Sequence, residues 1–115
     1  MNKFTTLKKV ELHLHLEGAA EPDLVRKICK DKNESLPNIF NEKGNYKCSS
    51  FDEFLKVYDV VTELFLDEKS FEKLLRHIID EQLKSNIIYS EIFLAPRLWG
   101  KSISEKWFSF LRIAK

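Results

Sequence analysis

Two histidines, His13 and His15, are the residues of this sequence whose type and spacing could carry chemistry. They alternate with leucines in residues 9–16, a pattern typical of a β-strand. Residues two positions apart on a strand are separated by roughly 6.6 Å and point to the same side. Two imidazoles so placed can converge on one metal ion, because zinc–nitrogen bonds are about 2.0–2.1 Å long. Imidazole favours Zn, Fe, Cu or Ni over Mg or Ca. The spacing therefore predicts a transition-metal site with His13 and His15 as ligands.

An HxH pair alone has other interpretations, either an exposed polar strand face or histidines that hydrogen bond to neighbouring carbonyl groups. The residues after it favour a site, since Glu17 and Gly18 end the strand and α/β enzymes place their active sites where strands end. If the strand persists to Glu17, its carboxylate would lie at the mouth of the site and could hold a group just outside the metal's own ligands, or a substrate hydroxyl. Strict alternation also puts Glu11 on the face of the two histidines.

Hydrophobic periodicity predicts the elements that must position these residues. Two strands are expected, at residues 9–16 and 87–94. The second is apolar at nearly every position, as in a parallel strand covered on both faces. Mostly helical segments separate the strands, and two strands so connected indicate parallel β–α units. The fold class is therefore α/β, and residues 1–115 form the amino-terminal portion of a larger, incomplete domain.

The helices are marked by their caps and apolar stripes. The first follows Pro22 and runs to about residue 32, and residues 33–50 form a long connection, which in proteins is usually functional or mobile. Ser50 opens a capping box for a helix over about residues 51–65. A further helix has Asp67 or Ser70 as its cap and ends at Asn86. After the second strand, another capping box and stripe are expected, with the residues Ser102, Glu105, Trp107, Phe108, Leu111 and Ala114.

Composition excludes several classes of protein. The 19 Lys and Arg residues against 18 Asp and Glu residues leave a net charge of +1, which gives no argument for nucleic acid or an anionic membrane as partner. No apolar run approaches the roughly 20 residues that span a bilayer, and the amino terminus lacks the features of a secretory signal. Cys29 and Cys48 form no CxxC pair, and a reducing, cytoplasmic setting is expected.

Residues 9–19, KVELHLHLEGA, resemble the amino-terminal signature of the adenosine and adenine deaminases, a metal-dependent branch of the amidohydrolase superfamily. Two later blocks resemble the same family in the same order. One is similar to the helix after its first long connection and consists of Ser49-Ser50-Phe51, Phe54-Leu55 and Tyr58-Asp59. The other is similar to its second barrel strand and consists of Tyr89-Ser90-Glu91-Ile92 with Pro96 after it.

The resemblance implies a (β/α)₈ barrel, of which this chain contains about the first two strands. It implies one Zn²⁺ per complete site, which activates water to replace the 6-amino group of a purine and release ammonia. His13 and His15 would be zinc ligands, and His15 would also lie near the substrate. Glu17 occupies a substrate-binding position that is usually aspartate in adenosine deaminases, where it contacts the ribose. Glutamate is more typical of adenine-deaminase-like relatives, so the substrate could be adenosine, adenine or a related purine.

The chain does not supply a whole catalytic set. A catalytic zinc needs three or more protein ligands, and the reaction needs a general acid. The third histidine, His77, is predicted to be a surface or partly packed residue of a helix, and no catalytic acid can be identified. A (β/α)₈ barrel needs roughly 250 residues. The sequence is therefore interpreted as a truncated copy without turnover, or as one piece that a complementing fragment completes.

Other interpretations stay open at this point. The chain could be a non-catalytic remnant, or a small α-rich binding module in which HxH is accidental. Amidohydrolases of cyclic amides also use HxH on a first strand, although the later blocks favour the deaminases. Glu91 could be a buried barrel residue paired with Arg97, or a solvent-facing residue at the end of its strand.

Overall fold

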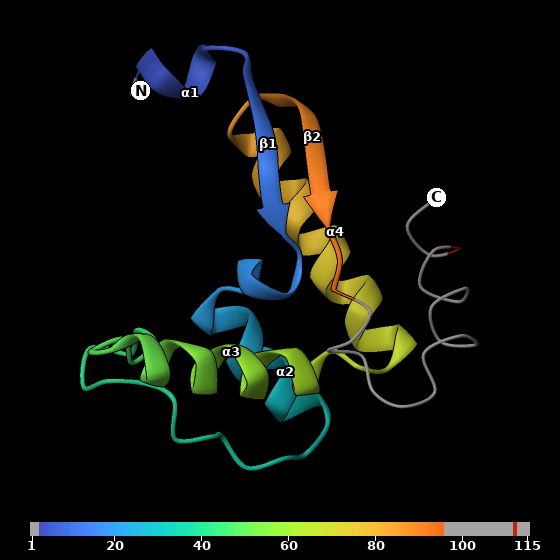
Figure 1. Ribbon diagram of the computed structural model, residues 1–115. Coiled ribbons are helices and arrows are strands. Elements are labelled where there is room, and N and C mark those ends of the chain that lie inside the picture. Colours follow the sequence, from blue (N-terminus) through green and yellow to red (C-terminus); the bar gives the residue numbers. More distant parts are fainter. Residues whose placement is uncertain (1–2, 96–111, 113–115) are drawn as a thin grey trace.

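The computed structural model describes residues 3–95 and residue 112 of the chain (Figure 1). Its elements in chain order are α1 (Lys3–Thr6), β1 (Lys9–His15), the 3₁₀ turn η1 (Glu17–Ala19), α2 (Pro22–Asp31), α3 (Phe51–Leu64), α4 (Glu68–Lys84) and β2 (Ile87–Phe93). Both strands and the three long helices were expected from the sequence, whereas the one-turn helix α1 was not. Several predicted features lie outside the described residues, namely those at Pro96, Arg97, Ser102, Glu105, Trp107, Phe108, Leu111 and Ala114.

The two strands pair in parallel, with α2, α3 and α4 in the crossover between them (Figure 1). Their carboxyl ends therefore lie at the same edge of the sheet, where His15 is the partner of Phe93. A backbone hydrogen bond of 3.1 Å from Leu16 N to Phe93 O continues the pairing past the end of β1. The predicted parallel arrangement is confirmed.

The pairing of β1 is irregular between Glu11 and Leu14, where three steps along β1 match two steps along β2. This extra residue is a β-bulge, and it changes which side chains share a face. The Glu11 carboxylate accepts a hydrogen bond from Gln82 of α4, and Leu14 packs against the buried core. Glu11 and Leu14 thus face the same side, and the prediction that Glu11 shares a face with the histidines is wrong.

The predicted caps explain where α3 and α4 begin. Ser50 Oγ accepts from Glu53 N at 3.1 Å, while the Glu53 carboxylate accepts from the backbone N–H of Ser49, one residue before the expected partner. Of the two candidate caps for α4, Asp67 is the one used, because its Oδ1 accepts from Ser70 N at 2.9 Å.

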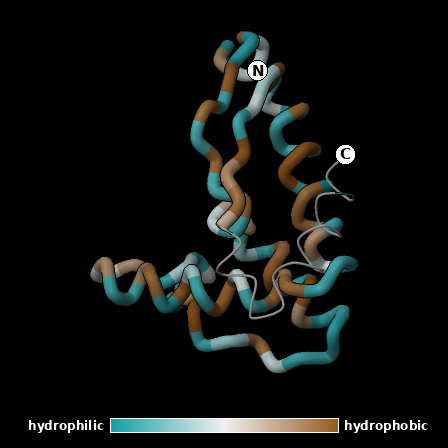
Figure 2. Tube along the Cα trace, turned by 45° about the vertical axis from the view of Figure 1, so that its right-hand side comes forward, coloured by the Kyte–Doolittle hydropathy of each residue, from teal (hydrophilic) through white to brown (hydrophobic). Residues whose placement is uncertain are grey.

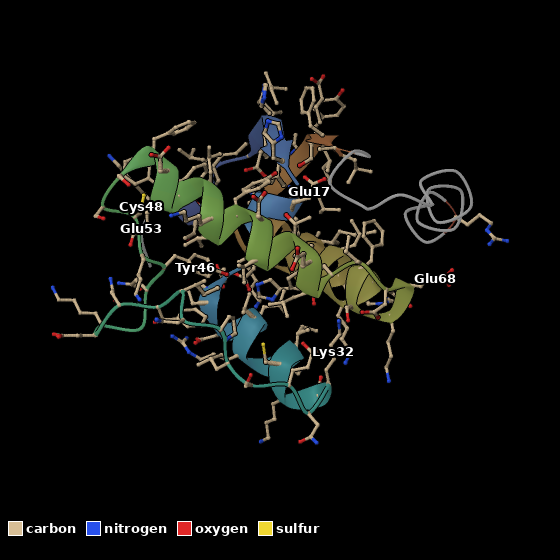
Figure 3. The ribbon with its side chains drawn as sticks, turned by 60° about the horizontal axis from the view of Figure 1, so that its bottom comes forward. Glu17, Lys32, Tyr46, Cys48, Glu53 and Glu68 are labelled. Carbon is tan, nitrogen blue, oxygen red and sulfur yellow. The ribbon has the colours of Figure 1, made fainter. Side chains whose placement is uncertain are left out.

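Asp67 also joins two helices. Lys32 lies at the end of α2 (Figure 3). It pairs with Asp67 Oδ2 at 2.6 Å and donates to Leu64 O at the end of α3. Burial alone would raise the pKa of Asp67, but the Lys32 ammonium and the hydrogen bonds from Ser70 outweigh burial and lower its pKa to about 2. The Lys32 ammonium therefore links the end of α2 to the last turn of α3 and to the cap of α4.

The core lies between the helices and the end of β1. Hydrophobic and hydrophilic residues alternate along α4, as Figure 2 shows, and its hydrophobic side contributes Phe71, Leu74, Leu75 and Ile78. Phe65, Phe71 and Leu74 are fully buried. Ile88, Tyr89 and Phe93 of β2 remain exposed, because the described residues supply only one neighbouring strand and leave part of this apolar strand uncovered. No helix in the described ranges has both the length and the apolar character that crossing a bilayer requires.

The long connection before α3 is folded against α2. Phe40 and Tyr46 form an antiparallel bridge around a turn in which Asn41 Oδ1 accepts from the backbone N–H of Lys43 and Asn45. Tyr46 Oη donates to Ala20 O at 2.7 Å, directly after η1. The connection is therefore anchored to the segment that follows β1.

Candidate functional site

The two imidazoles lie side by side at the carboxyl end of β1. The Nε2 atoms of His13 and His15 are 3.1 Å apart, their ring centroids are separated by 5.0 Å, and both residues are exposed. The structure therefore brings together the pair that the sequence singled out, with one nitrogen of each ring directed toward the other.

Phe93, at the end of β2, completes this cluster. Its ring stacks on His13, with centroids 4.3 Å apart and an interplanar angle of 19°. Its centroid lies 5.7 Å from that of His15. Sequence reasoning missed this residue, although parallel strands bring their carboxyl ends to one edge and both strands were predicted. That rule, applied to the predicted strand ends, could have found Phe93.

Glu17 is placed differently from the expectation. The strand ends at His15, and η1 turns the Glu17 side chain into the protein, where it is 1% exposed. Its Oε1 accepts from Ala95 N at 2.7 Å, and its Oε2 accepts from Tyr58 Oη at 3.3 Å. Figure 3 shows Glu17 beside α3, near the strands. The prediction that its carboxylate lies at the mouth of the site is wrong, while its contact with a substrate stays a prediction.

Tyr58 of α3 covers the turn that holds Glu17. Burial, with a further contribution from the Glu17 carboxylate, raises the pKa of Tyr58 to about 12. A Cβ atom at Gly18 would lie 2.9 Å from Tyr58 Cε2, so only glycine fits beside this ring without a shift. A cavity of about 70 Å³ adjoins these residues, and its other lining side chains include Tyr46, Cys48, Phe54 and Val57.

The remaining titratable candidates lie elsewhere. His77 is partly packed on α4, with its Nε2 3.4 Å from a carboxylate oxygen of Glu21. It lines a cavity with Glu11, which faces α4. Glu91 is exposed and accepts from Tyr89 Oη at 3.0 Å. Within residues 3–95 and 112, no three His, Cys, Asp or Glu side chains are grouped as a metal site would need.

The sequence is similar to that of known deaminases. The sequence model described as "Adenosine deaminase" matches residues 8–108. An adenine deaminase from Mesorhizobium japonicum is 39% identical over 89 residues, which are 76% of this chain and 27% of that protein. An adenine deaminase from Rhizobium leguminosarum is 40% identical over 90 residues, 78% of this chain and 28% of that protein. The chain thus spans little more than a quarter of the length of these curated relatives.

Solved structures share the fold. The adenine deaminase from Arthrobacter aurescens superposes with a TM-score of 0.62 at 21% identity and covers 77% of this chain and 28% of its own. The N6-mAMP deaminase from Arabidopsis gives a TM-score of 0.69 at 21% identity, over 99% of this chain and 36% of its own. The predicted fold, a partial (β/α)₈ barrel, is confirmed. The family match over residues 8–108, which is most of the sequence, places the chain in the adenosine deaminase family.

Proposed function

We propose that this chain provides the amino-terminal, metal-binding part of an enzyme that hydrolytically deaminates a 6-aminopurine with the help of zinc. The observation that carries the proposal is the 3.1 Å separation of His13 Nε2 and His15 Nε2. Family membership supports the reaction class, and the geometry of the imidazole pair supports the metal.

The imidazole pair fits a zinc ion by distance and by chemistry. Two nitrogen ligands at about 2.0–2.1 Å from a tetrahedral zinc are about 3.3–3.4 Å apart, close to the observed separation of 3.1 Å. Imidazole is a preferred zinc ligand. When bound, zinc supplies a Lewis acid that activates water at neutral pH. His13 and His15 would hold the ion, and Phe93 would keep the His13 ring in place.

The substrate class follows from the relatives. The curated relatives from Mesorhizobium japonicum and Rhizobium leguminosarum are both named adenine deaminases, and an Arabidopsis structure of the same fold contains IMP. We propose a 6-aminopurine as substrate, adenine or adenosine among them, with His15 near the ring. The family pattern also implies a substrate contact for Glu17, whose carboxylate accepts hydrogen bonds from Tyr58 Oη and Ala95 N in the present structure.

The isolated 115-residue chain is expected to have no turnover. The described residues supply two candidate ligands, and they include no group of three that could hold a metal. A catalytic zinc with three or more protein ligands and a general acid would need residues from elsewhere, so a complementing fragment is the proposed partner. A cytoplasmic setting stays a prediction.

A zinc titration of the purified chain tests the proposal. We expect the wild-type chain to bind one Zn²⁺, and we expect His13→Ala and His15→Ala each to raise the Kd at least about tenfold through the loss of a ligand. His77→Ala is the matched control and should leave the Kd unchanged, because His77 lies on α4, with its Nε2 near Glu21 and outside the imidazole pair. Equal affinities for all four chains would mean that HxH is accidental, as in a small α-rich binding module.

An activity assay completes this test. Ammonia release from adenine and adenosine should stay at background for the zinc-loaded chain alone. Release above background would contradict the expectation that the chain lacks turnover, while leaving the proposed substrate class intact.

A further inference from the structure

Glu17 is the only fully buried charged residue among those that the structure describes, with 1% of its surface exposed. Burying a carboxylate is costly unless hydrogen bonds compensate it, so such a residue needs a structural or functional reason. The contacts of Glu17 supply one, since they join three elements that meet at the carboxyl end of the sheet.

Each carboxylate oxygen of Glu17 contacts a different element. Oε1 accepts from the backbone N–H of Ala95, two residues past the end of β2, at 2.7 Å. Oε2 accepts from Tyr58 Oη of α3 at 3.3 Å. Glu17 itself follows β1 by two residues. One side chain therefore connects the segment after β1, the segment after β2 and the middle of α3.

The same two strand ends position the imidazole pair. His15 is the sheet partner of Phe93, and Phe93 stacks on His13. Next to this pairing, a single backbone hydrogen bond from Leu16 N to Phe93 O continues the contact between the strand ends. The bond from Ala95 N to Glu17 is the next connection along the chain. Without it, the segment after Phe93 would have less to hold it against β1.

We propose that Glu17 is a positioning residue, whose carboxylate ties the ends of β1 and β2 to α3 and thereby keeps the two imidazoles and Phe93 in the arrangement that binds metal. The role in metal binding rests on the proposed function, whereas the tie between the strands does not. In the observed arrangement the side chain is buried and each carboxylate oxygen accepts a hydrogen bond from the protein, so the tie forms without a bound ligand.

The test uses the complete 115-residue chain, with Glu17→Gln as the main variant. Glutamine has nearly the same shape but loses the charge and one acceptor. Glu91→Gln is the matched control, because Glu91 also accepts from a tyrosine, Tyr89, but does so at an exposed position. Two quantities are measured for each chain. The first is the hydrogen exchange rate of the Ala95 amide. The second is the Kd for Co²⁺, added as the only metal and monitored by the absorption spectrum of the bound ion.

We expect Glu17→Gln to speed exchange of the Ala95 amide at least about tenfold, because a charge-assisted hydrogen bond is stronger than a neutral one. We expect the Kd for Co²⁺ to rise about 10- to 100-fold, as is usual when a residue that orients metal ligands is changed. Glu91→Gln should change neither quantity. Unchanged exchange and unchanged Kd in Glu17→Gln would overturn the proposal.

The two measurements separate the possible failures. If the wild-type chain does not bind Co²⁺, the proposed function fails, and the exchange rate alone decides whether Glu17 ties the strand ends together. If exchange speeds up but the Kd stays constant, Glu17 stabilises the fold without positioning the imidazoles, and the proposal is wrong. Should Glu17→Gln fail to fold, Tyr58→Phe removes only one hydroxyl and carries the same test, with smaller changes in the same direction expected.

Discussion

The ring of Phe93 stacks on the imidazole of His13, with an interplanar angle of 19° and centroids 4.3 Å apart. The two residues come from different strands, and the contact forms only because the parallel strands end at the same edge. An aromatic partner on one side of the imidazole limits its rotation. The orientation of a candidate ligand on β1 thus depends on a residue of β2.

Phe93→Ala should weaken metal binding with little change in stability. An aromatic pair contributes about 0.5–1.5 kcal/mol, so we expect the Kd for Zn²⁺ to rise about 2- to 12-fold. Because Phe93 is 42% exposed, its removal leaves no core cavity, and the thermal midpoint should hardly move. Isothermal titration and thermal unfolding measure the two effects. Phe4→Ala, another exposed phenylalanine outside the site, is the control, and an equal loss of affinity there would contradict this account.

Gly18→Ala should destabilise the chain by about 1–3 kcal/mol, the usual cost of inserting atoms into a packed site. The new Cβ would lie 2.9 Å from Tyr58 Cε2. Urea unfolding gives the change in free energy. A double-mutant cycle with Tyr58→Ala identifies the cause, because the cost should largely disappear once the ring is absent. A cost that persists in the Tyr58→Ala background would show that another contact is responsible.

Much of the fold could be predicted from the sequence because its signals are local. The capping residues Ser50 and Asp67 mark where α3 and α4 begin, and the alternation in residues 9–16 marks β1. The faces of β1 could not be predicted, because the bulge between Glu11 and Leu14 depends on pairing with β2. The hydrophobic pattern of one strand does not show how that strand pairs with a segment far away in the sequence.

Only the part of the candidate site that lies on a single strand could be predicted from the sequence. His13 and His15 share a face because of their spacing, which any strand would impose. Phe93 and Tyr58 enter through contacts between elements far apart in the sequence. The direction of Glu17 was missed because the strand ends at His15, and a 3₁₀ turn then rotates the next side chains out of the strand alternation.

Phe71→Ala should cost about 3–5 kcal/mol of unfolding free energy, the usual range for a buried phenylalanine. Phe71 is fully buried in the core cluster. Phe51→Ala is a matched control at the first turn of α3, and its side chain is 71% exposed. We expect a change within about 0.5 kcal/mol for that control. Chemical unfolding followed by circular dichroism measures both, and similar costs would contradict the described core.

Asp67 should make stability depend on pH below about 4. Its pKa is lowered from 3.8 to about 2 in the folded chain, so the folded state binds fewer protons and the stabilisation is complete only above the unfolded pKa. It should be lost as the pH falls from about 4 to about 2. Since the side chain is half exposed, we expect an effect within about 1 kcal/mol.

Asp67→Asn isolates this contribution, because asparagine also caps helices but carries no charge. The difference in unfolding free energy between wild type and variant should shrink as the pH falls through this window. A difference that stays constant from pH 6 to about pH 2 would mean that the ion pair with Lys32 contributes nothing.

The bulge divides β1 into two segments. Side chains alternate between the two faces of the sheet within each segment, but the alternation does not continue from one segment to the next. Residues 9–11 follow one alternation and residues 14–15 another, and Leu12 and His13 lie at the change. Deleting one residue from a regular strand would turn over every later side chain. Here a chain without Leu12 should regain simple alternation with Glu11 toward α4 and both imidazoles on their present side. Its affinity for zinc should then stay close to that of the intact chain. The imidazole pair would thus tolerate the deletion of one residue within its own strand.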